Sequence, residues 1–171
     1  MRLTILFLIL LVSSCSTNYK NQAVLGEVFP SVKGESLNKK SWLIPQDFAG
    51  TNILLLVGYK QDSQFDIDRW LIGIDMKKID IKVYELPTIQ GMFPRMFKTQ
   101  INNGMRKGIP NPLWGAVITI YSDGNRVQEF TGNEKPNNAR VILLDKKGTI
   151  QYFYDRGFSV QALNELQKAI N

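Results

Sequence analysis

Histidine is absent from the 171-residue sequence, and cysteine occurs once, at Cys15. The chain therefore lacks the side chain that most often acts as a general base, activates a nucleophile or binds a transition metal near neutral pH. A single cysteine cannot form a disulfide within the chain, so a disulfide-stabilised scaffold is excluded. Carboxylates and lysines remain, so catalysis as such is not excluded. With 44% hydrophobic and 21% charged residues, the composition is that of one globular domain rather than a disordered chain.

The first fifteen residues have the pattern of a targeting segment. Arg2 supplies a positive charge, residues 5–12 form an apolar run, and Ser13 and Ser14 precede Cys15. The run is shorter than the ~20 residues that a membrane-spanning helix needs. The segment resembles the bacterial lipobox. An ordinary signal peptide that contains a cysteine, or a single membrane anchor, are the alternatives.

The lipobox resemblance implies that residues 1–14 are removed and that Cys15 carries a diacylglyceryl group and an N-acyl chain such as palmitate. It implies a lipoprotein of the cell envelope that faces the periplasm, and Ser16 favours the outer over the inner membrane. Residues 15–23 are then predicted to form the lipidated cysteine and a polar tether, and residues 24–171 the folded domain. With Cys15 lipidated, the domain would contain no thiol.

The same features bound the partners and cofactors. We expect no metal and no cofactor apart from the covalent lipid, because neither histidine nor a free thiol remains to bind one. The formal net charge of +6 is compatible with anionic lipid or acidic protein patches. Nucleic acid is not expected as a partner, because the envelope location and the missing zinc-finger spacing both argue against it.

Apolar runs separated by glycines predict an α/β fold. Five consecutive large apolar residues at 53–57 predict a central parallel strand that is buried on both faces. Residues 141–144 have the same character, Gly148 suits a tight turn, and the alternation over 149–154 predicts an antiparallel partner. The predicted strands are 51–58, 79–86, 116–121, 139–145 and 149–154.

Helices are predicted between and after these strands. The helix after the first strand is expected to bury Phe65, Trp70, Leu71 and Ile74. The last helix, over residues 159–170, is expected to begin at Ser159 as its N-terminal cap. Its predicted apolar stripe consists of Val160, Leu163, Leu166 and Ile170.

The stretch VILLDKKGTIQYFYDRGFS, at residues 141–159, resembles the end of thioredoxin-like domains. The order of elements over residues 24–171 is similar to that of peroxiredoxins and membrane-anchored thioredoxins. This resemblance implies a three-layer fold with a central mixed sheet of about five strands flanked by helices. The segments FPSVKGESL, ILLLVGYKQDSQFDIDRW, NNGMRKGIP and RVILLDKKGTI also resemble mitochondrial ATP synthase assembly factors and their bacterial relatives. That family chaperones a membrane subunit during assembly.

The resemblance also indicates where a catalytic site would lie. In thioredoxin-like enzymes the loop after the first central strand carries the nucleophilic cysteine, at the N-terminus of a helix that lowers its pKa. The matching loop here contains Lys60, Gln61, Asp62 and Ser63, and no cysteine. Asp62 or Ser63 is predicted to cap the helix, and a serine nucleophile without a base is the alternative. Ala139 stands where those enzymes have a cis-proline, so this loop and Ala139 form a degenerate active site.

A stretch rich in methionine and phenylalanine, residues 90–107, has two interpretations. In one, Pro94 begins a helix that packs Phe97, Ile101 and Met105 on the sheet. In the other, the stretch forms an adaptable apolar surface with a basic rim that binds a partner polypeptide. The predicted partner-binding residues are Met92, Phe93, Arg95, Met96, Arg106 and Trp114.

Two functions from different classes follow. The first is a non-catalytic, monomeric envelope lipoprotein that binds a partner protein or a membrane-inserted segment, in an assembly-factor or chaperone-like role. The alternative is a periplasmic thiol-redox or peroxide-handling protein, which the absence of cysteine and histidine from residues 24–171 disfavours.

Overall fold

The computed structural model describes residues 17–170, so Cys15 and the predicted signal peptide lie outside the described residues. The strands are β1 (Val32–Ser36), β2 (Ser41–Ile44), β3 (Ile53–Gly58), β4 (Lys82–Pro87), β5 (Ile118–Thr119), β6 (Arg140–Leu144) and β7 (Ile150–Tyr154). The α-helices are α1 (Gln64–Met76), α2 (Met92–Met96), α3 (Lys98–Gly108), α4 (Gly124–Thr131) and α5 (Val160–Ile170). Short 3-10 turns are η1 (Gln46–Phe48), η2 (Gln61–Ser63) and η3 (Asn111–Leu113).

The central strand of the main sheet is β3, because its apolar run can be buried on both faces. All six of its residues are buried. It pairs parallel with β4 and antiparallel with β6, and β6 pairs antiparallel with β7. The predicted strands 51–58 and 139–145 are therefore confirmed, and they are neighbours in the sheet. Gly148 has a φ of 82° in the turn between β6 and β7, the conformation that the sequence predicted for it.

A second sheet extends the first. β1 pairs with β2 in an antiparallel hairpin and with β5 on its other side, which gives the order β2-β1-β5. Parallel bridges from Glu85 to Val117 and from Thr88 to Ile120 connect β5 to the edge of β4. The strand predicted at 116–121 is thus only two residues long, because its flanking residues make isolated bridges rather than a continuous ladder.

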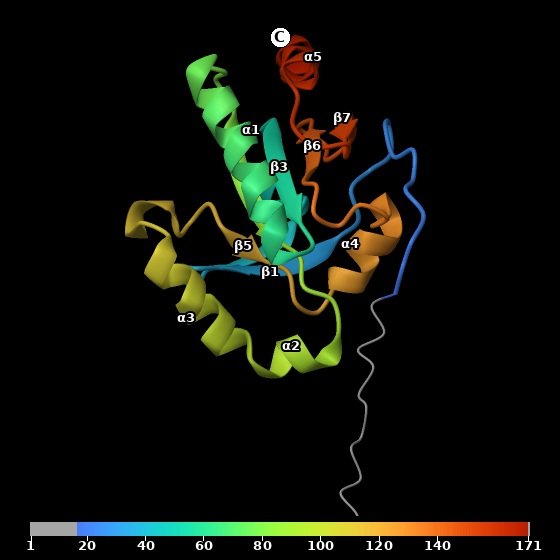
Figure 1. Cartoon of the computed structure of the whole chain (residues 1–171). Coiled ribbons are helices and arrows are strands. Elements are labelled where there is room, and N and C mark those ends of the chain that lie inside the picture. Colours follow the sequence, from blue (N-terminus) through green and yellow to red (C-terminus); the bar gives the residue numbers. More distant parts are fainter. Residues whose placement is uncertain (1–16, 171) are drawn as a thin grey trace, which may run out of the picture.

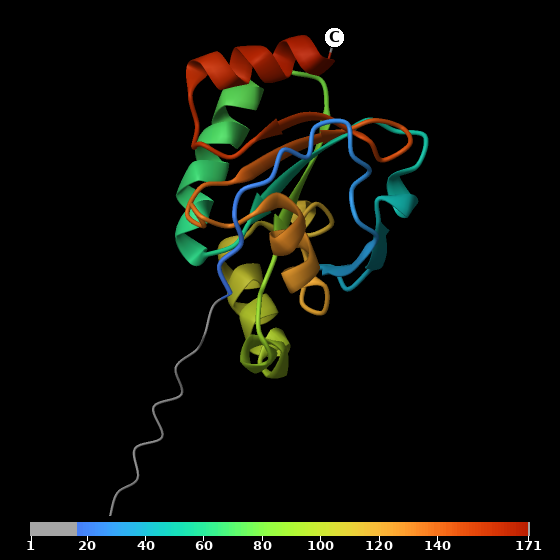
Figure 2. The ribbon, with the colours of Figure 1, turned by 90° about the vertical axis from the view of Figure 1, so that its right-hand side faces the viewer.

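Two cores lie on opposite faces of the main sheet. On one face, β3 and β6 pack against α1 and α5 through Trp70, Leu163 and Leu166. On the other face, the same strands pack against α4 and the N-terminal segment through Val127 and Phe29. Figure 2 shows residues 17–30 (blue) crossing this second face. The predicted three-layer α/β architecture is confirmed, with α1 and α5 beside the sheet as Figure 1 shows.

Of the four residues that the sequence predicted to be buried on α1, Trp70 and Ile74 are buried and Leu71 is half-buried, but Phe65 is 70% exposed. Asp66, the next residue, is buried instead. The reason is a pair of hydrogen bonds to distant backbone groups, described below.

The last helix follows the prediction more closely. The Ser159 hydroxyl accepts a hydrogen bond from the backbone N–H of Ala162 at 3.1 Å, which confirms the predicted cap. Leu163 and Leu166 are buried, but Val160 is largely exposed because it lies at the very start of the helix.

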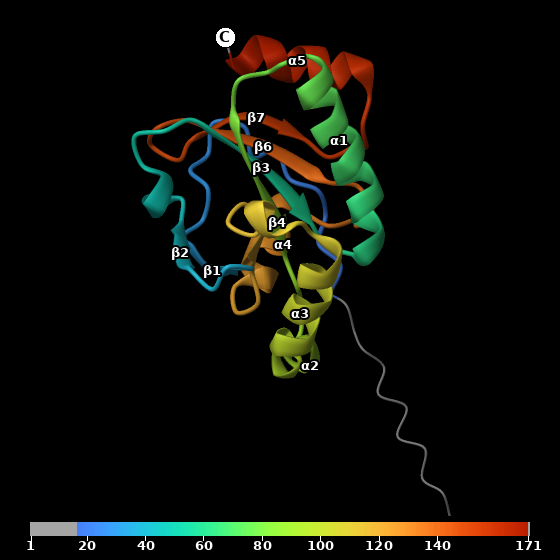
Figure 3. The same cartoon turned by 90° about the vertical axis from the view of Figure 1, so that its left-hand side faces the viewer.

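The stretch predicted as a single helix after residue 94 is two helices, α2 and α3, which meet at Phe97. Phe97 is exposed, and Ile101 and Met105 are only half-buried. The buried side chain of α3 is instead Asn102, which accepts a hydrogen bond from the Tyr121 hydroxyl at 2.8 Å. The predicted packing of this apolar stripe on the sheet is therefore wrong. Figure 3 shows α2 and α3 at the end of the domain opposite α5.

Candidate functional site

A cavity of about 480 Å³ lies beyond the carboxyl ends of the parallel strands β3 and β4. In open α/β sheets ligands bind at this edge, because the loops that follow parallel strands converge there. Its walls come from the loop after β3, the loop after β4, the end of α4 and the segment before β6. Tyr59, Lys60 and Gln61 form the first wall, so the predicted degenerate active-site loop borders this cavity.

Ser63 is buried and bonded within its own loop. It is 2% exposed, and its hydroxyl donates a hydrogen bond to the Lys60 carbonyl at 2.6 Å. A Cβ at Gly58 would lie 2.5 Å from the Ser63 oxygen, so the glycine is what lets the hydroxyl pack against β3. Ser63 occupies the N-cap position of α1, as one of the two predicted candidates. Its side chain makes no capping hydrogen bond, so the prediction that its hydroxyl caps the helix is wrong. Asp62 is exposed.

Ala139 is tied to α1. The Asp66 carboxylate accepts hydrogen bonds from the backbone N–H of Ala139 at 2.9 Å and from that of Phe158 at 2.7 Å. Asp66 is 5% exposed, so its charge is stabilised mainly by these two donors. The bonds join α1 to the start of β6 and to the loop before α5, and they hold Ala139 in place relative to α1.

A buried pair of side chains was not predicted from the sequence: Tyr59, just after β3, and Arg140, at the start of β6. The hydroxyl of Tyr59 bonds to the Thr131 hydroxyl, and burial raises the pKa of Tyr59 to about 12. The guanidinium of Arg140 lies 4.7 Å from the centre of the Tyr59 ring, and burial lowers the pKa of Arg140. Arg140 donates to the carbonyls of Lys135 and Asn138 at 2.7 and 2.9 Å, while its Nε and Nη2 have no hydrogen-bond partner. The signal that could have revealed this pair is a charged residue directly before an apolar strand.

The N-terminal segment lines the same cavity through Thr17 and Asn18. The backbone N–H of Tyr19 donates to the Asn133 side chain at 2.7 Å, and the Asn133 N–H donates to the Tyr19 carbonyl at 2.9 Å. Gln22 continues this pairing with a bond from its N–H to the Thr131 carbonyl at 3.2 Å. Residues 17–22, predicted as a free tether, are instead hydrogen-bonded to the domain, which corrects that part of the domain assignment.

The predicted partner-binding residues lie on separate parts of the surface. Met92 and Phe93 begin α2, and their side chains are outside the described part of the structure. Met96, the last residue of α2, is 72% exposed. Arg95 donates to the carbonyls of Tyr121 and Ser122 at 3.0 and 2.9 Å, so its charge is used within the fold.

Arg106 lies in the last turn of α3, and Trp114 follows η3. The Nε of Arg106 donates to the Leu37 carbonyl at 2.7 Å, and the Trp114 indole donates to the Ile109 carbonyl at 2.8 Å. Arg106 is eight residues after Lys98, so roughly 12 Å of helix separates it from the start of α3. Its guanidinium lies 5.7 Å from the centre of the Trp114 ring, so the predicted contact residues fall into two groups, one in α2 and one at the end of α3.

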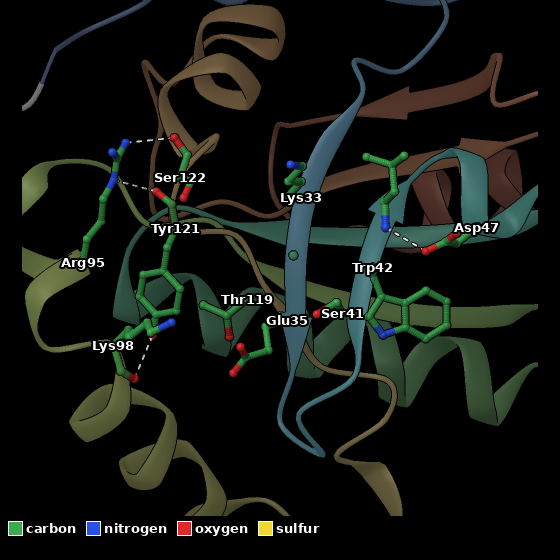
Figure 4. Close-up of a pocket in the computed structure, with 12 residues that line it drawn as sticks. Lys33, Glu35, Ser41, Trp42, Asp47, Arg95, Lys98, Thr119, Tyr121 and Ser122 are labelled. Atoms are coloured by element: carbon green, nitrogen blue, oxygen red, sulfur yellow. Dashed lines mark hydrogen bonds between the residues drawn. The ribbon is translucent and has the colours of Figure 1, made fainter.

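A second, more open groove of about 740 Å³ lies along β1 and β2. Figure 4 shows Trp42 and Asp47 on one side of β1, and Arg95, Lys98 and Tyr121 on the other. Desolvation raises the pKa of Tyr121 to about 12. The groove mixes basic, acidic and aromatic groups, and Arg95 is already held by backbone carbonyls. It lies beside the sheet of the N-terminal hairpin rather than at the degenerate site.

Two absences concern only the part of the chain that the structure describes. Across residues 17–170 there is no group of three or more acidic, cysteine or histidine side chains placed to hold a metal ion. Over the same residues, no helix combines the length and apolar character needed to cross a membrane.

Comparison with known proteins gives the fold but no family. No protein-family model and no curated protein sequence matches the chain. Among solved structures, the chain is similar to the thioredoxin domain of a thiol-disulfide oxidoreductase from Bacteroides vulgatus, with a TM-score of 0.57 and 20% identity over 88% of this chain and 100% of that chain.

Two other solved structures are similar at lower identity. A thiol peroxidase from Chromobacterium violaceum has a TM-score of 0.57 and 13% identity, over 89% of this chain and 90% of that chain. An exposed lipoprotein thioredoxin from Streptococcus pneumoniae has a TM-score of 0.53 and 11% identity, over 81% of this chain and 98% of that chain. The chain therefore has a thioredoxin-like fold, and the resemblance drawn from the sequence is confirmed at that level.

Proposed function

We propose that this protein is a non-catalytic, thioredoxin-like lipoprotein of the cell envelope that binds a polypeptide segment at the degenerate active-site end of its sheet. The observation that carries the proposal is the burial of Ser63 in the loop that borders the cavity at that end. Where thioredoxin-like enzymes place a reactive thiol, this chain has Ser63, whose hydroxyl is buried and bonded to the Lys60 carbonyl. A hydroxyl in that position has neither a base to activate it nor access to a substrate.

The walls of the cavity suit a polypeptide ligand. Gln61 brings an exposed side-chain amide to its rim, and an amide can both donate to and accept from a peptide backbone. The amides of Gln128 and Asn133, by contrast, are buried and hydrogen-bonded to each other at 2.7 Å, so they shape the wall of the cavity. Tyr59 stays protonated at physiological pH because burial raises its pKa to about 12, so it offers no general base. The chain's own residues 19–22 already pair with residues 131–134 at the edge of this site.

The lipid anchor is part of the proposal and rests on the lipobox pattern that ends at Cys15. The Streptococcus pneumoniae relative in fold is also described as a lipoprotein. An assembly-factor or chaperone-like role, with an envelope protein or a membrane-inserted segment as the partner, fits a thiol-free domain held at a membrane. The outer membrane, facing the periplasm, is the favoured location because Ser16 follows the cysteine.

The test measures binding and turnover on the full lipidated chain in detergent. We expect a permanently unfolded, alkylated polypeptide to bind, and we expect Gln61→Trp, which fills the cavity from its exposed rim, to weaken binding by at least about tenfold, or 1.4 kcal/mol. Lys168→Trp on the exposed side of α5 is the matched control and should bind as the wild type does. Equal binding by both variants would show that the cavity is not the binding site.

The alternative function is tested with the same preparation. Insulin reduction and peroxide consumption should not exceed the rate of a Cys15→Ser variant. Sustained turnover by the wild type would establish the redox function and overturn the binding proposal.

A further inference from the structure

The path of the N-terminal segment determines how far the folded domain can stand from its anchor. Thr17 is the first described residue, and its carbonyl accepts a hydrogen bond from the Asn133 side chain at 2.9 Å. Cys15 precedes Thr17 by two residues. Two residues of extended chain span at most about 7 Å, so Cys15 must lie within that distance of Thr17.

Residues 17–22 are built into the fold rather than resting on it. Asn133 is 6% exposed and bonds to this segment through its backbone and both polar atoms of its side chain. Next to it, Gly132 has a φ of 77°, and a Cβ there would lie 2.2 Å from the Cα of Asn21 and 2.4 Å from the Lys20 carbonyl oxygen. The backbone of the segment therefore passes across a glycine that leaves room for it.

Two further interactions hold the C-terminal end of the segment. Asn21 and Glu134 exchange hydrogen bonds between side chain and backbone, each at 3.2 Å. Val24, just beyond the segment, is 3% exposed and belongs to the core beneath α4. The chain is thus fixed relative to the domain from Thr17 onwards.

The fixed segment begins at one end of the molecule. Thr17 lines the cavity at the carboxyl ends of β3 and β4, and Figures 1 and 3 show α2 at this end and α5 at the opposite end. α1 runs between the two ends, and its thirteen residues correspond to about 20 Å. At the Thr17 end, α2 exposes Met96, which is 72% accessible.

We propose that residues 17–22 act as a rigid spacer that holds the α2 end of the domain against the phospholipid bilayer, with the degenerate active-site cavity at the level of the lipid headgroups. The proposal rests on the lipid anchor of the proposed function. It narrows the ligand of the cavity to a polypeptide segment that lies at the membrane–water interface. Met96, as an exposed apolar side chain, would enter the interfacial layer.

The test uses the full lipidated chain, reconstituted in vesicles of phosphatidylethanolamine and phosphatidylglycerol that carry a headgroup-bound quencher. Fluorophores are attached to Met96→Cys on α2 and, as the matched control, to Lys168→Cys on α5, both of which are exposed. Because α1 alone separates the two ends by roughly 20 Å, quenching at α2 should exceed quenching at α5 by at least about threefold.

A second variant tests whether the short N-terminal segment orients the domain or whether the α2 end simply adheres to the bilayer. A ten-residue Gly/Ser insert between Ser16 and Thr17 leaves every described residue unchanged but adds an average reach of roughly 17 Å. The ratio of quenching between the two sites should then fall by at least about half. An unchanged ratio would overturn the spacer, and so would equal quenching of both labels in the chain without the insert.

The labelling chemistry shows which proposal has failed. In a lipidated chain the engineered cysteine is the only free thiol, so one fluorophore per chain is expected. Two fluorophores per chain, together with an unmodified N-terminal mass, would overturn the anchor and the orientation that depends on it. One fluorophore per chain with equal quenching would overturn the orientation alone.

Discussion

Replacing Asp66 with asparagine should destabilise the fold far more than the same replacement of an exposed aspartate on α1. The carboxylate accepts two backbone hydrogen bonds, from Ala139 at 2.9 Å and from Phe158 at 2.7 Å, and Asp66 is 5% exposed. Asparagine keeps the shape but replaces one acceptor oxygen with an NH₂ group, which would face an N–H donor. Losing one charge-assisted bond at a buried site is expected to cost about 2–3 kcal/mol. For a domain of this size, that lowers Tm by roughly 4–12 °C.

The assay is urea unfolding of the full chain in detergent, followed by circular dichroism. Asp68→Asn is the matched control, because Asp68 is exposed on the same helix and accepts a hydrogen bond from Gln64 at 2.9 Å on the surface. Its change in unfolding free energy should stay within about 0.5 kcal/mol. If Asp66→Asn loses no more than Asp68→Asn, then Asp66 does not join α1 to β6, and the account of the degenerate site is wrong.

Three other substitutions test the buried groups and the turn. Since the pKa of Tyr59 is raised from 10.0 to about 12, its contribution to stability is complete below pH 10 and is lost as the pH rises towards 12. The free energy of unfolding, measured in urea, should therefore fall between pH 9 and pH 11 by about 1.3 kcal/mol less in Tyr59→Phe than in the wild type. An equal fall in both proteins would contradict the raised pKa. Gly148→Ala would place a Cβ 2.6 Å from Pro45 at a φ of 82°, so it should lower the free energy of unfolding by at least about 2 kcal/mol. Gly50→Ala has a similar φ of 86° but its Cβ meets nothing within 4 Å, so it should cost only about 1 kcal/mol. Equal losses would show that the contact with Pro45 does not contribute. Arg140→Met should change the unfolding free energy by less than about 2 kcal/mol, because the buried guanidinium has two nitrogens without hydrogen-bond partners. A loss above about 3 kcal/mol would show that its contacts with Tyr59 and two carbonyls outweigh the cost of its desolvation.

Sequence patterns located those parts of the fold that depend on local preferences. The apolar run at 53–57 predicted a strand buried on both faces, and β3 is fully buried. Gly148 and Ser159 were predicted from the conformations that a tight turn and a helix cap require, and both adopt them. The same reasoning succeeded for Trp70 and Ile74 on α1 but failed at Phe65, which lies in the first turn of the helix and is exposed.

The degenerate site was located only in part. The loop at 60–63 and Ala139 were found from the order of the strands, but the cavity that Lys60 and Gln61 border also depends on α4 and on Thr17. No local pattern marked Asn133 as the residue that holds the N-terminal segment. Its bond to Tyr19 joins positions 114 residues apart, and sequence periodicity carries no information at that separation.

The sequence by itself limited the chemistry that side chains can perform and determined the four strands of the main sheet. The lack of histidine and the single cysteine limit catalysis whatever the fold, and continuous apolar runs must be buried because water excludes them. Only the tertiary structure decided that Asp66 and Arg140 are buried and that residues 17–22 are bound to the domain. The burial of Asp66 and Arg140 depends on hydrogen bonds between their side chains and backbone groups. The path of residues 17–22 depends on bonds between distant backbone groups, which exist only after the chain has folded.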